Sequence, residues 1–156
     1  MEGEIEVIDT ESWHVVFVAS NMREGDVNEL LAVGTTPLRS LIHGFKKSDR
    51  CMTLMVDGIP AAIFGITPMG MLSGKGSPWL LGTEDIFKVS RKFLKGSKGI
   101  VQEWADRYKL LLNYVDVRNK QSIRWLEWLG FSIVAAVPIG VNGEMFHPFY
   151  IGDPNV

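Results

Sequence analysis

Three charged residues early in the chain, Arg23, Asp26 and Glu29, follow one another at intervals of three. In a helix this spacing places the side chains on one face, where Arg23 and Asp26 can form an ion pair. Such a cluster is most often a solvated helix face, and the alternative is the wall of a cleft. The spacing alone leaves both roles open.

The histidines and the single cysteine offer less chemistry. His14, His43 and His147 are scattered without ligand spacing, so the sequence predicts no metal site. Cys51 opens an apolar stretch and no histidine is indicated as its partner, which favours a core position over a nucleophile. The sequence also lacks a Ser-His-Asp order and a Walker-type phosphate loop.

Basic residues gather between positions 88 and 98, in a chain with 16 basic and 18 acidic residues. Because the chain is nearly neutral, we expect no nucleic-acid partner. The longest apolar run, 133–141, is far short of the roughly 20 residues that span a bilayer. Three glutamates among the first six residues are unlike a signal peptide. We therefore expect a protein that is neither secreted nor membrane-bound.

The elements that must position these residues follow from apolar periodicity and turn signals. Asp57-Gly58 and Asn142-Gly143 each lie between apolar runs and predict hairpin turns, because both residues of such a pair tolerate positive φ. Gly96 and Gly99 interrupt the longest helical pattern, where close packing on a sheet would compensate their low helix propensity. The predicted strands are 5–8, 52–56, 59–66, 78–82, 110–117, 131–137 and 145–151, and the predicted helices are 13–21, 24–33, 37–44, 88–108 and 119–129.

The order of these elements predicts an α/β fold (α+β by some schemes) in a single domain, 1–156. Residues 78–117 form a βαβ unit, and a right-handed crossover makes its two strands parallel. We expect a mixed sheet of about six to seven strands with helices on both faces.

One segment adds a family resemblance. Residues 119–131 read NKQSIRWLEWLGF, and they resemble the stretch after the fifth strand of the GNAT (N-acetyltransferase-like) fold. In that arrangement Asn119 caps the helix, Ser122 allows a close approach to neighbours, and Gly130 turns the chain into the next strand.

The wider chain resembles a narrower group, the phage acetyltransferase-like family known as internal virion protein A. The matching stretches are 21–29, 79–83, 113–119, 123–131 and 146–149. This resemblance implies a bacteriophage origin, and with it a location in the host cytoplasm during infection or in the virion. It also raises the chance that Arg23, Asp26 and Glu29 line a cleft.

The GNAT resemblance implies acetyl-CoA as cofactor, without a metal. In that fold the strand before the long helix splays from the next strand, and its backbone pairs with the pantetheine arm. Glu84, at the end of the central strand, is the candidate general base, and Arg23, Asp26 and His147 lie on the acceptor side. The implied cofactor-binding residues are Leu80, Leu81, Gly82, Lys88, Ser90, Arg91, Lys92 and Asn119.

Two departures from the family pattern weaken this site. The turn after Gly82 lacks the usual glycines, so side chains such as Lys88 would have to hold phosphates, unless they form a solvated basic face. Leu126 stands where many family members have a tyrosine that protonates the leaving thiolate. Tyr108, Tyr114 or a water could replace it.

Two functions therefore remain open. The first is an N-acetyltransferase that moves an acetyl group from acetyl-CoA to an amine on a small molecule or a protein. The second is a catalytically inactive protein of the same fold that acts in virion assembly or binds host proteins, with phage structural or host proteins as its partners.

Overall fold

One mixed sheet runs through the part of the chain that the structure describes. The computed structural model describes residues 4–89 and 91–155, apart from the side chains of 91–93. Eight strands follow the order β1-β2-β3-β4-β5-β8-β6, with β7 also paired to β8. The strands are β1 (Ile5–Asp9), β2 (Arg50–Val56), β3 (Ile59–Pro68), β4 (Lys75–Gly82), β5 (Leu110–Asp116), β6 (Ser132–Ile133), β7 (Val137–Pro138) and β8 (Met145–Gly152).

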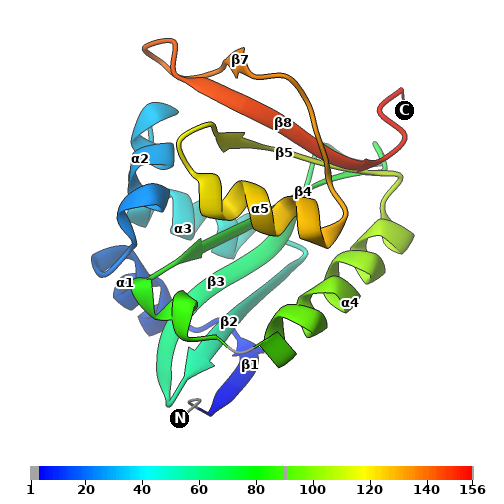
Figure 1. Ribbon diagram of the computed structural model, residues 1–156. Helices are drawn as coiled ribbons and strands as arrows, with labels where there is room; N and C mark the ends of the chain where they lie inside the picture. The colour runs from blue at the N-terminus through cyan, green and yellow to red at the C-terminus, as the bar shows by residue number, and fades with distance from the viewer. Residues whose placement is uncertain (1–3, 90, 156) are drawn as a thin grey trace.

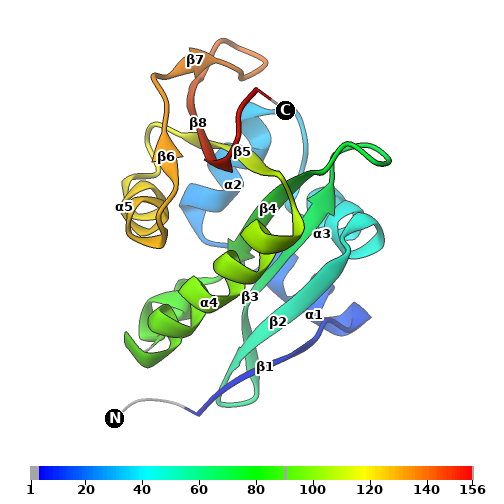
Figure 2. The same cartoon turned by 90° about the vertical axis from the view of Figure 1, so that its right-hand side faces the viewer.

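Helices cover both faces of this sheet (Figure 2). The first three lie on one face and the last two on the other, as the sequence predicts for an α/β fold. The helices are α1 (Ser12–Ser20), α2 (Glu24–Ala32), α3 (Pro37–Lys47), α4 (Arg91–Arg107) and α5 (Lys120–Leu129), and a short 3-10 helix, η1 (Glu84–Lys88), follows β4.

The two faces of the sheet carry separate hydrophobic clusters. Beneath α4 and α5, the larger cluster includes Val101, Trp104 and Leu129, which lie on the helix faces that the periodicity predicts to be buried. On the other face, Val18 of α1 and Leu41 of α3 pack against the sheet. Burying a side chain of this size contributes roughly 1.5–3 kcal/mol, so both helical layers are held mainly by apolar contact.

The predicted turn at Asp57-Gly58 is confirmed. Asp57 has φ of 51° and Gly58 has φ of 77°, the positive values that a type I′ turn requires, and β2 and β3 pair antiparallel across it. Gly130 ends α5 with φ of 101°, a left-handed conformation that glycine adopts without steric cost.

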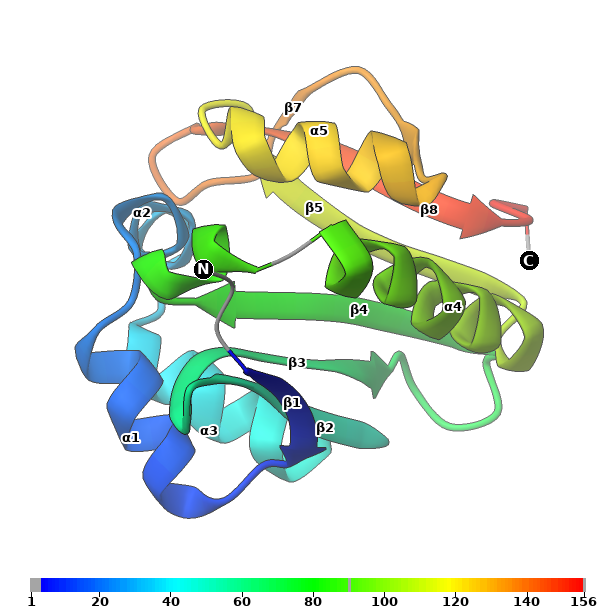
Figure 3. The same cartoon turned by 60° about the horizontal axis from the view of Figure 1, so that its bottom comes forward.

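Strands β4 and β5 are parallel, as predicted, but they pair only at their beginnings. The ladder joins Lys75 to Leu110 and Gly76 to Leu111, and in the described chain it stops there. Beyond these pairs the strands diverge (Figures 1 and 3), and we call the region between them the wedge. Strand β4 starts three residues earlier than predicted, and this extension makes the parallel pairing.

The predicted strand 131–137 is split into β6 and β7, which is why the described sheet has eight strands. Ile133 pairs with Phe149, and Val137 pairs with Phe146. Between these two pairs the chain advances four residues from Ile133 to Val137 but only three residues along β8, as in a β-bulge. The break falls opposite Pro148, which has no N–H to donate. The Val134 carbonyl lies 2.8 Å from Nδ1 of His147 instead, so this side chain takes the place of the missing backbone donor.

One explanation offered by the sequence is wrong. Gly96 and Gly99 are exposed on α4, and a Cβ atom added at either position would meet no described side chain within 4 Å. Packing on the sheet therefore does not account for them.

Candidate functional site

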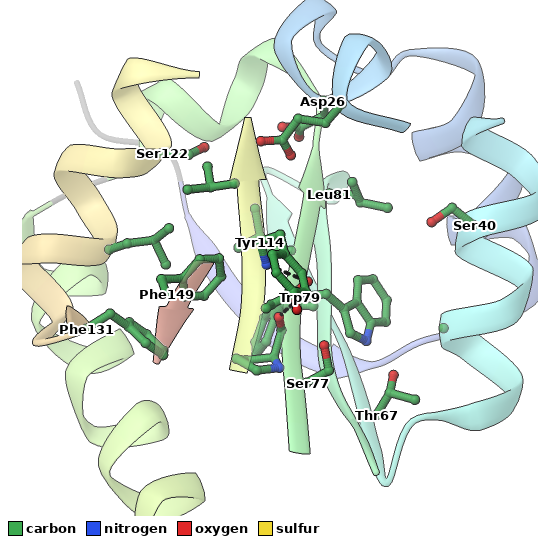
Figure 4. Close-up of a pocket in the computed structure, with 18 of the residues that line it drawn as sticks. Asp26, Ser40, Thr67, Ser77, Trp79, Leu81, Tyr114, Ser122, Phe131 and Phe149 are labelled. Carbon is green, nitrogen blue, oxygen red and sulfur yellow. Dashed lines mark hydrogen bonds between the residues drawn. The ribbon is translucent and has the colours of Figure 1, made fainter. Parts of the chain in front are cut away.

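A cavity of about 560 Å³ occupies the wedge and reaches both faces of the sheet. On one face its wall is apolar, with Trp104 from α4 and Leu126 from α5. On the other face α2 contributes Asp26 and Glu29, and α3 contributes His43. Figure 4 shows Asp26 entering from α2, with Ser122 on the α5 side and Ser40 on the α3 side. We call this space the wedge cavity.

The backbone of Leu80 faces the wedge. Along β4 the N–H and C=O groups of alternate residues point to the same side. Gly82 donates its N–H to α2 rather than to β3, and the Pro78 carbonyl accepts from β5. Leu80 lies between these two, so its N–H and C=O also point away from β3 and toward the diverging strand. Leu81 points the opposite way, toward Ile63 of β3.

Asn113 closes the narrow end of the wedge. Its Nδ2 donates a 2.8 Å hydrogen bond to the Pro78 carbonyl across the gap. A side chain thus replaces the next rung of the ladder, and the free backbone of β4 begins at Leu80.

Two carboxylates of α2 close the wide end. Asp26 Oδ2 accepts a 2.9 Å hydrogen bond from the Gly82 N–H on β4, and Glu29 Oε1 accepts a 2.8 Å bond from the Asp116 N–H on β5. The Gly82 carbonyl accepts a further bond of 2.9 Å from the Arg23 N–H. Both backbone groups of Gly82 are therefore engaged within the chain.

Arg23 ties α2 to its surroundings through a buried guanidinium. It forms an ion pair with Asp26, donates a 3.2 Å hydrogen bond to Asn119 Oδ1, and lies 5.4 Å from the centre of the Phe87 ring. Burial is the largest influence on Asp26 and raises the pKa of its carboxyl group, although the Arg23 charge opposes the rise. The cluster predicted from spacing thus belongs to a buried network.

Asn119 does not cap α5 with its side chain, so that prediction is wrong. It occupies the N-cap position, but its Oδ1 turns to Arg23, and among the described residues its Nδ2 has no hydrogen-bond partner. Asp116 makes a paired contact with Arg118 nearby, with Nη2 to Oδ2 at 2.6 Å. Burial alone would raise the pKa of Asp116, but the hydrogen bonds and charge of Arg118 lower it.

Glu29 has the unusual acidity in this site. Burial is the main cause that raises the pKa of its carboxyl group to about 7, and the neighbouring carboxylates of Asp26 and Asp116 add to the rise. The hydrogen bond from the Asp116 N–H opposes it. A carboxylate with this acidity can take and release a proton near neutral pH.

The residues predicted for phosphate binding and for base catalysis lie elsewhere or are not described. Glu84 is exposed in η1 and is not part of the cavity wall. Lys88, also exposed, forms a 3.0 Å ion pair with Asp85. Ser90 lies outside the described residues, as do the side chains of Arg91 and Lys92.

Four other residues that were named from the sequence are now placed. Leu126, at the position of the family tyrosine, lines the cavity, and so does Tyr114 of β5. Tyr108 directs its hydroxyl to Asp49 Oδ2 at 3.4 Å instead. His147, predicted on the acceptor side, is not among the cavity-lining residues and bonds Val134 as described above.

The sequence gives no signal for Trp79 as part of the site. It offers Glu29 only as a member of the charged cluster and Tyr114 only as a possible replacement for the tyrosine missing at Leu126. The i, i+3, i+6 spacing of the α2 cluster was the available signal for Glu29. Trp79 is held in the wall by a 2.8 Å hydrogen bond from its Nε1 to Ser48 Oγ, and no local pattern signals that contact.

Cys51 and the possible metal ligands add no chemistry here. The Cys51 thiol lies 3.4 Å from Thr10 Oγ1, and burial raises its pKa. Within residues 4–89 and 91–155, no cluster of His, Cys, Asp and Glu side chains could hold a metal ion. Over the same residues, every helix is too short or too polar to cross a bilayer.

The sequence comparison connects the chain to a phage protein. The chain is similar to the probable scaffold protein gp13 of Escherichia phage T7, with 28% identity over 109 residues that cover 67% of this chain and 70% of that protein. This match supports a phage relative but not the internal virion protein family that the sequence suggested. No protein family profile matches the chain.

Solved structures give a consistent answer for the fold. The chain is similar to a GNAT-family acetyltransferase from Streptococcus pneumoniae, with a TM-score of 0.66, 14% identity and coverage of 95% and 99% of the two chains. For an N-acetyltransferase from Staphylococcus aureus Mu50 the TM-score is 0.71 and the sequence identity is 10%, with coverage of 96% of this chain and 98% of that chain. For spermidine N-acetyltransferase from Vibrio cholerae, solved with CoA and spermine, the TM-score is 0.67 and the sequence identity is 11%, with coverage of 94% of each chain. The architecture of this chain is therefore that of the GNAT acetyltransferases.

Proposed function

We propose that this protein is an acetyltransferase that binds acetyl-CoA in the wedge and transfers the acetyl group to an amine. The observation that carries the proposal is the interrupted β4–β5 ladder. It leaves the Leu80 N–H and C=O directed into a cavity of about 560 Å³. An extended amide chain such as the pantetheine arm can pair with these two groups as a third strand would.

Two further features fit this substrate. The neighbouring wall is apolar, with Trp104, Trp125 and Leu126, and it suits an aliphatic arm. Ser122 on α5 leaves room beside the wedge because of its small side chain. The spermidine N-acetyltransferase from Vibrio cholerae was solved with CoA, and the protein yncA from Salmonella typhimurium, which has the same fold, was solved with acetyl-CoA. The proposal extends that binding to this chain.

The first experiment is calorimetric titration of the protein with acetyl-CoA, together with thermal unfolding. A ligand at about 100 times its Kd adds roughly 2.7 kcal/mol to the free energy of unfolding, so a clear rise in Tm is expected. Ser122→Trp should fill the wedge and abolish binding. Glu127→Trp, an exposed position on the same helix, is the matched control and should bind normally. Absence of binding by the wild-type protein at millimolar acetyl-CoA would contradict the proposal.

A second candidate function is a role in phage assembly, favoured by the similarity to the probable scaffold protein of phage T7. Such a role does not need acetyl-CoA. The test replaces gp13 in phage T7 with this chain and measures the yield of phage particles. If the chain acts only in assembly, the wild-type chain and Ser122→Trp should give equal yields. A yield that falls only with Ser122→Trp would favour catalysis, and yields no better than without gp13 would count against this candidate.

A further inference from the structure

We propose that Glu29 is the general base of the reaction and that the acceptor is a primary amine on an apolar body, such as an arylalkylamine. This inference rests on the proposed acetyl transfer and adds to it the proton acceptor and the acceptor class.

The position of Glu29 is the first argument. It lies on the second turn of α2, at the wide end of the wedge, and its side chain is partly buried. Glu29 and Leu80 line the same cavity, so the carboxylate faces the space into which the free backbone of β4 opens. A general base must reach the reacting nitrogen directly or through one water, and this cavity allows both.

The free oxygen of Glu29 is the second argument. Its Oε1 accepts from the Asp116 N–H, and in the described chain no hydrogen bond of normal geometry engages its Oε2, although the Asn119 amide lies close enough to lower the pKa of this carboxyl group. Asp26 differs, because its Oδ1 is paired with Arg23 and its Oδ2 accepts from Gly82. Of the two α2 carboxylates in the cavity wall, Glu29 therefore has an oxygen available to take a proton.

The surrounding charges favour proton uptake near neutral pH. Burial and two neighbouring carboxylates raise the pKa of Glu29 to about 7, close to the value at which a base is most effective. The titratable or charged groups around it are Arg23 and Asp26 of α2, His43 of α3, Tyr114 and Asp116 of β5, and Arg118 just after β5.

The acceptor class follows from the rest of the wall. On the α2–α3 side the cavity is lined by Leu30, Val33, Trp79 and Leu81, with Tyr114 beside them. Trp79 is fixed by its bond to Ser48 and by contact with Gly44, where a Cβ atom would lie 2.5 Å from the indole ring. A rigid apolar wall with one proton-accepting carboxylate matches an amine at the end of an apolar body. It matches a polyamine less well, because each further ammonium group would lose its hydration in apolar surroundings.

The reaction balances with these groups. The amine nitrogen bonds to the thioester carbonyl carbon, and the carbon–sulfur bond breaks. Glu29 takes the proton that the amine nitrogen loses, and the thiolate of CoA takes up one proton from water as it leaves. Return of the Glu29 proton to solvent completes the cycle, with an amide and free CoA as products.

The test measures thiol release from acetyl-CoA with phenethylamine as acceptor, between about pH 5 and 9. The wild-type kcat/KM should rise with pH through a midpoint near 7. Glu29→Gln keeps an oxygen for the Asp116 N–H but cannot take the proton. It should lower kcat by about 10²–10⁴-fold and abolish the rise of kcat/KM with pH. The calorimetric Kd for acetyl-CoA should stay unchanged. Glu24→Gln, an exposed position on the same helix, should behave as wild type.

Two results would overturn the inference while leaving acetyl-CoA binding intact. One is a Glu29→Gln variant that keeps the wild-type rate and its rise with pH. The other is a wild-type protein that binds acetyl-CoA but acetylates phenethylamine at no pH in this range. Failure to bind acetyl-CoA at all is a different outcome, and it would refute the proposed function itself.

Discussion

Asp26 and Glu29, one turn apart on α2, accept hydrogen bonds from two different strands of the sheet. Asp26 takes the Gly82 N–H of β4 at 2.9 Å and Glu29 takes the Asp116 N–H of β5 at 2.8 Å. Without these acceptors, the diverging strands would leave buried donors unpaired, which proteins rarely tolerate. One helix therefore satisfies both edges of the wedge and fixes its width.

This relationship predicts different outcomes for two substitutions at Glu29. Glu29→Ala leaves the Asp116 N–H without its partner and should lower the free energy of unfolding by about 1–3 kcal/mol. Glu29→Gln retains an oxygen that can accept from the Asp116 N–H, so it should lower the free energy of unfolding much less. Urea denaturation at neutral pH measures both. Equal losses for the two variants would show that the hydrogen bond to β5 does not hold the wedge.

The acidity of Glu29 predicts a pH-dependent stability. Its pKa is about 7 in the folded protein and 4.5 as the ordinary value. Since the folded state holds the proton more tightly, the contribution of Glu29 is fully present below about pH 4.5 and is lost as pH rises through about 7. The loss is at most about 3 kcal/mol.

The measurement compares wild type with Glu29→Gln by urea denaturation at several pH values between about 5 and 8. The stability of the wild type should fall relative to the variant as pH rises. The lowered pKa of Asp116 acts in the opposite direction and below this window, because its contribution is lost as pH falls past its ordinary value of 3.8. A constant difference between the two proteins would contradict the raised pKa.

Local signals in the sequence were sufficient for most of the fold. Asp57-Gly58 specified a turn through backbone conformations that few other pairs adopt, and the apolar spacing of Val101 and Trp104 identified the buried face of α4. The split of the last-but-one strand was missed because its cause lies on another strand, where Pro148 lacks a donor. A pattern read along one segment contains no information about its partner.

The candidate site was less predictable for the same reason. Arg23 and Asp26 were recognised by their spacing, but their contacts with Asn119 and Gly82 join residues 96 and 56 positions apart. Glu84 was chosen because it follows the central strand, yet η1 turns it into solvent. The acidity of Glu29 depends on burial and on Asp116, which only the folded arrangement supplies.

The buried ion pair of Arg23 and Asp26 should show strong energetic coupling. Arg23→Met leaves the Asp26 carboxylate buried without its counter-charge and should destabilise the protein by about 3–5 kcal/mol. Combining it with Asp26→Asn removes that charge while an amide oxygen still accepts from Gly82. The double variant should be more stable than the sum of the two single losses predicts, as measured by a double-mutant cycle. Additive losses would mean that the two side chains act independently.

Two glycines in helices should respond in opposite directions to the same substitution. Alanine is favoured over glycine in a helix interior by about 1 kcal/mol. Gly99 is exposed on α4 with open space around it, so Gly99→Ala should raise the free energy of unfolding by about that amount. Gly44 on α3 faces Trp79, where a Cβ atom would lie 2.5 Å from the ring.

Gly44→Ala must therefore displace the indole or the helix, and overpacking of this kind costs about 1–3 kcal/mol, enough to cancel or exceed the gain in propensity. Because Trp79 lines the wedge cavity, the displacement should also change its fluorescence, whereas Gly99→Ala should leave the spectrum unaltered. Thermal unfolding and emission spectra of the two variants provide the comparison. A Gly44→Ala protein as stable as Gly99→Ala, with an unchanged spectrum, would show that α3 does not press on this wall of the cavity.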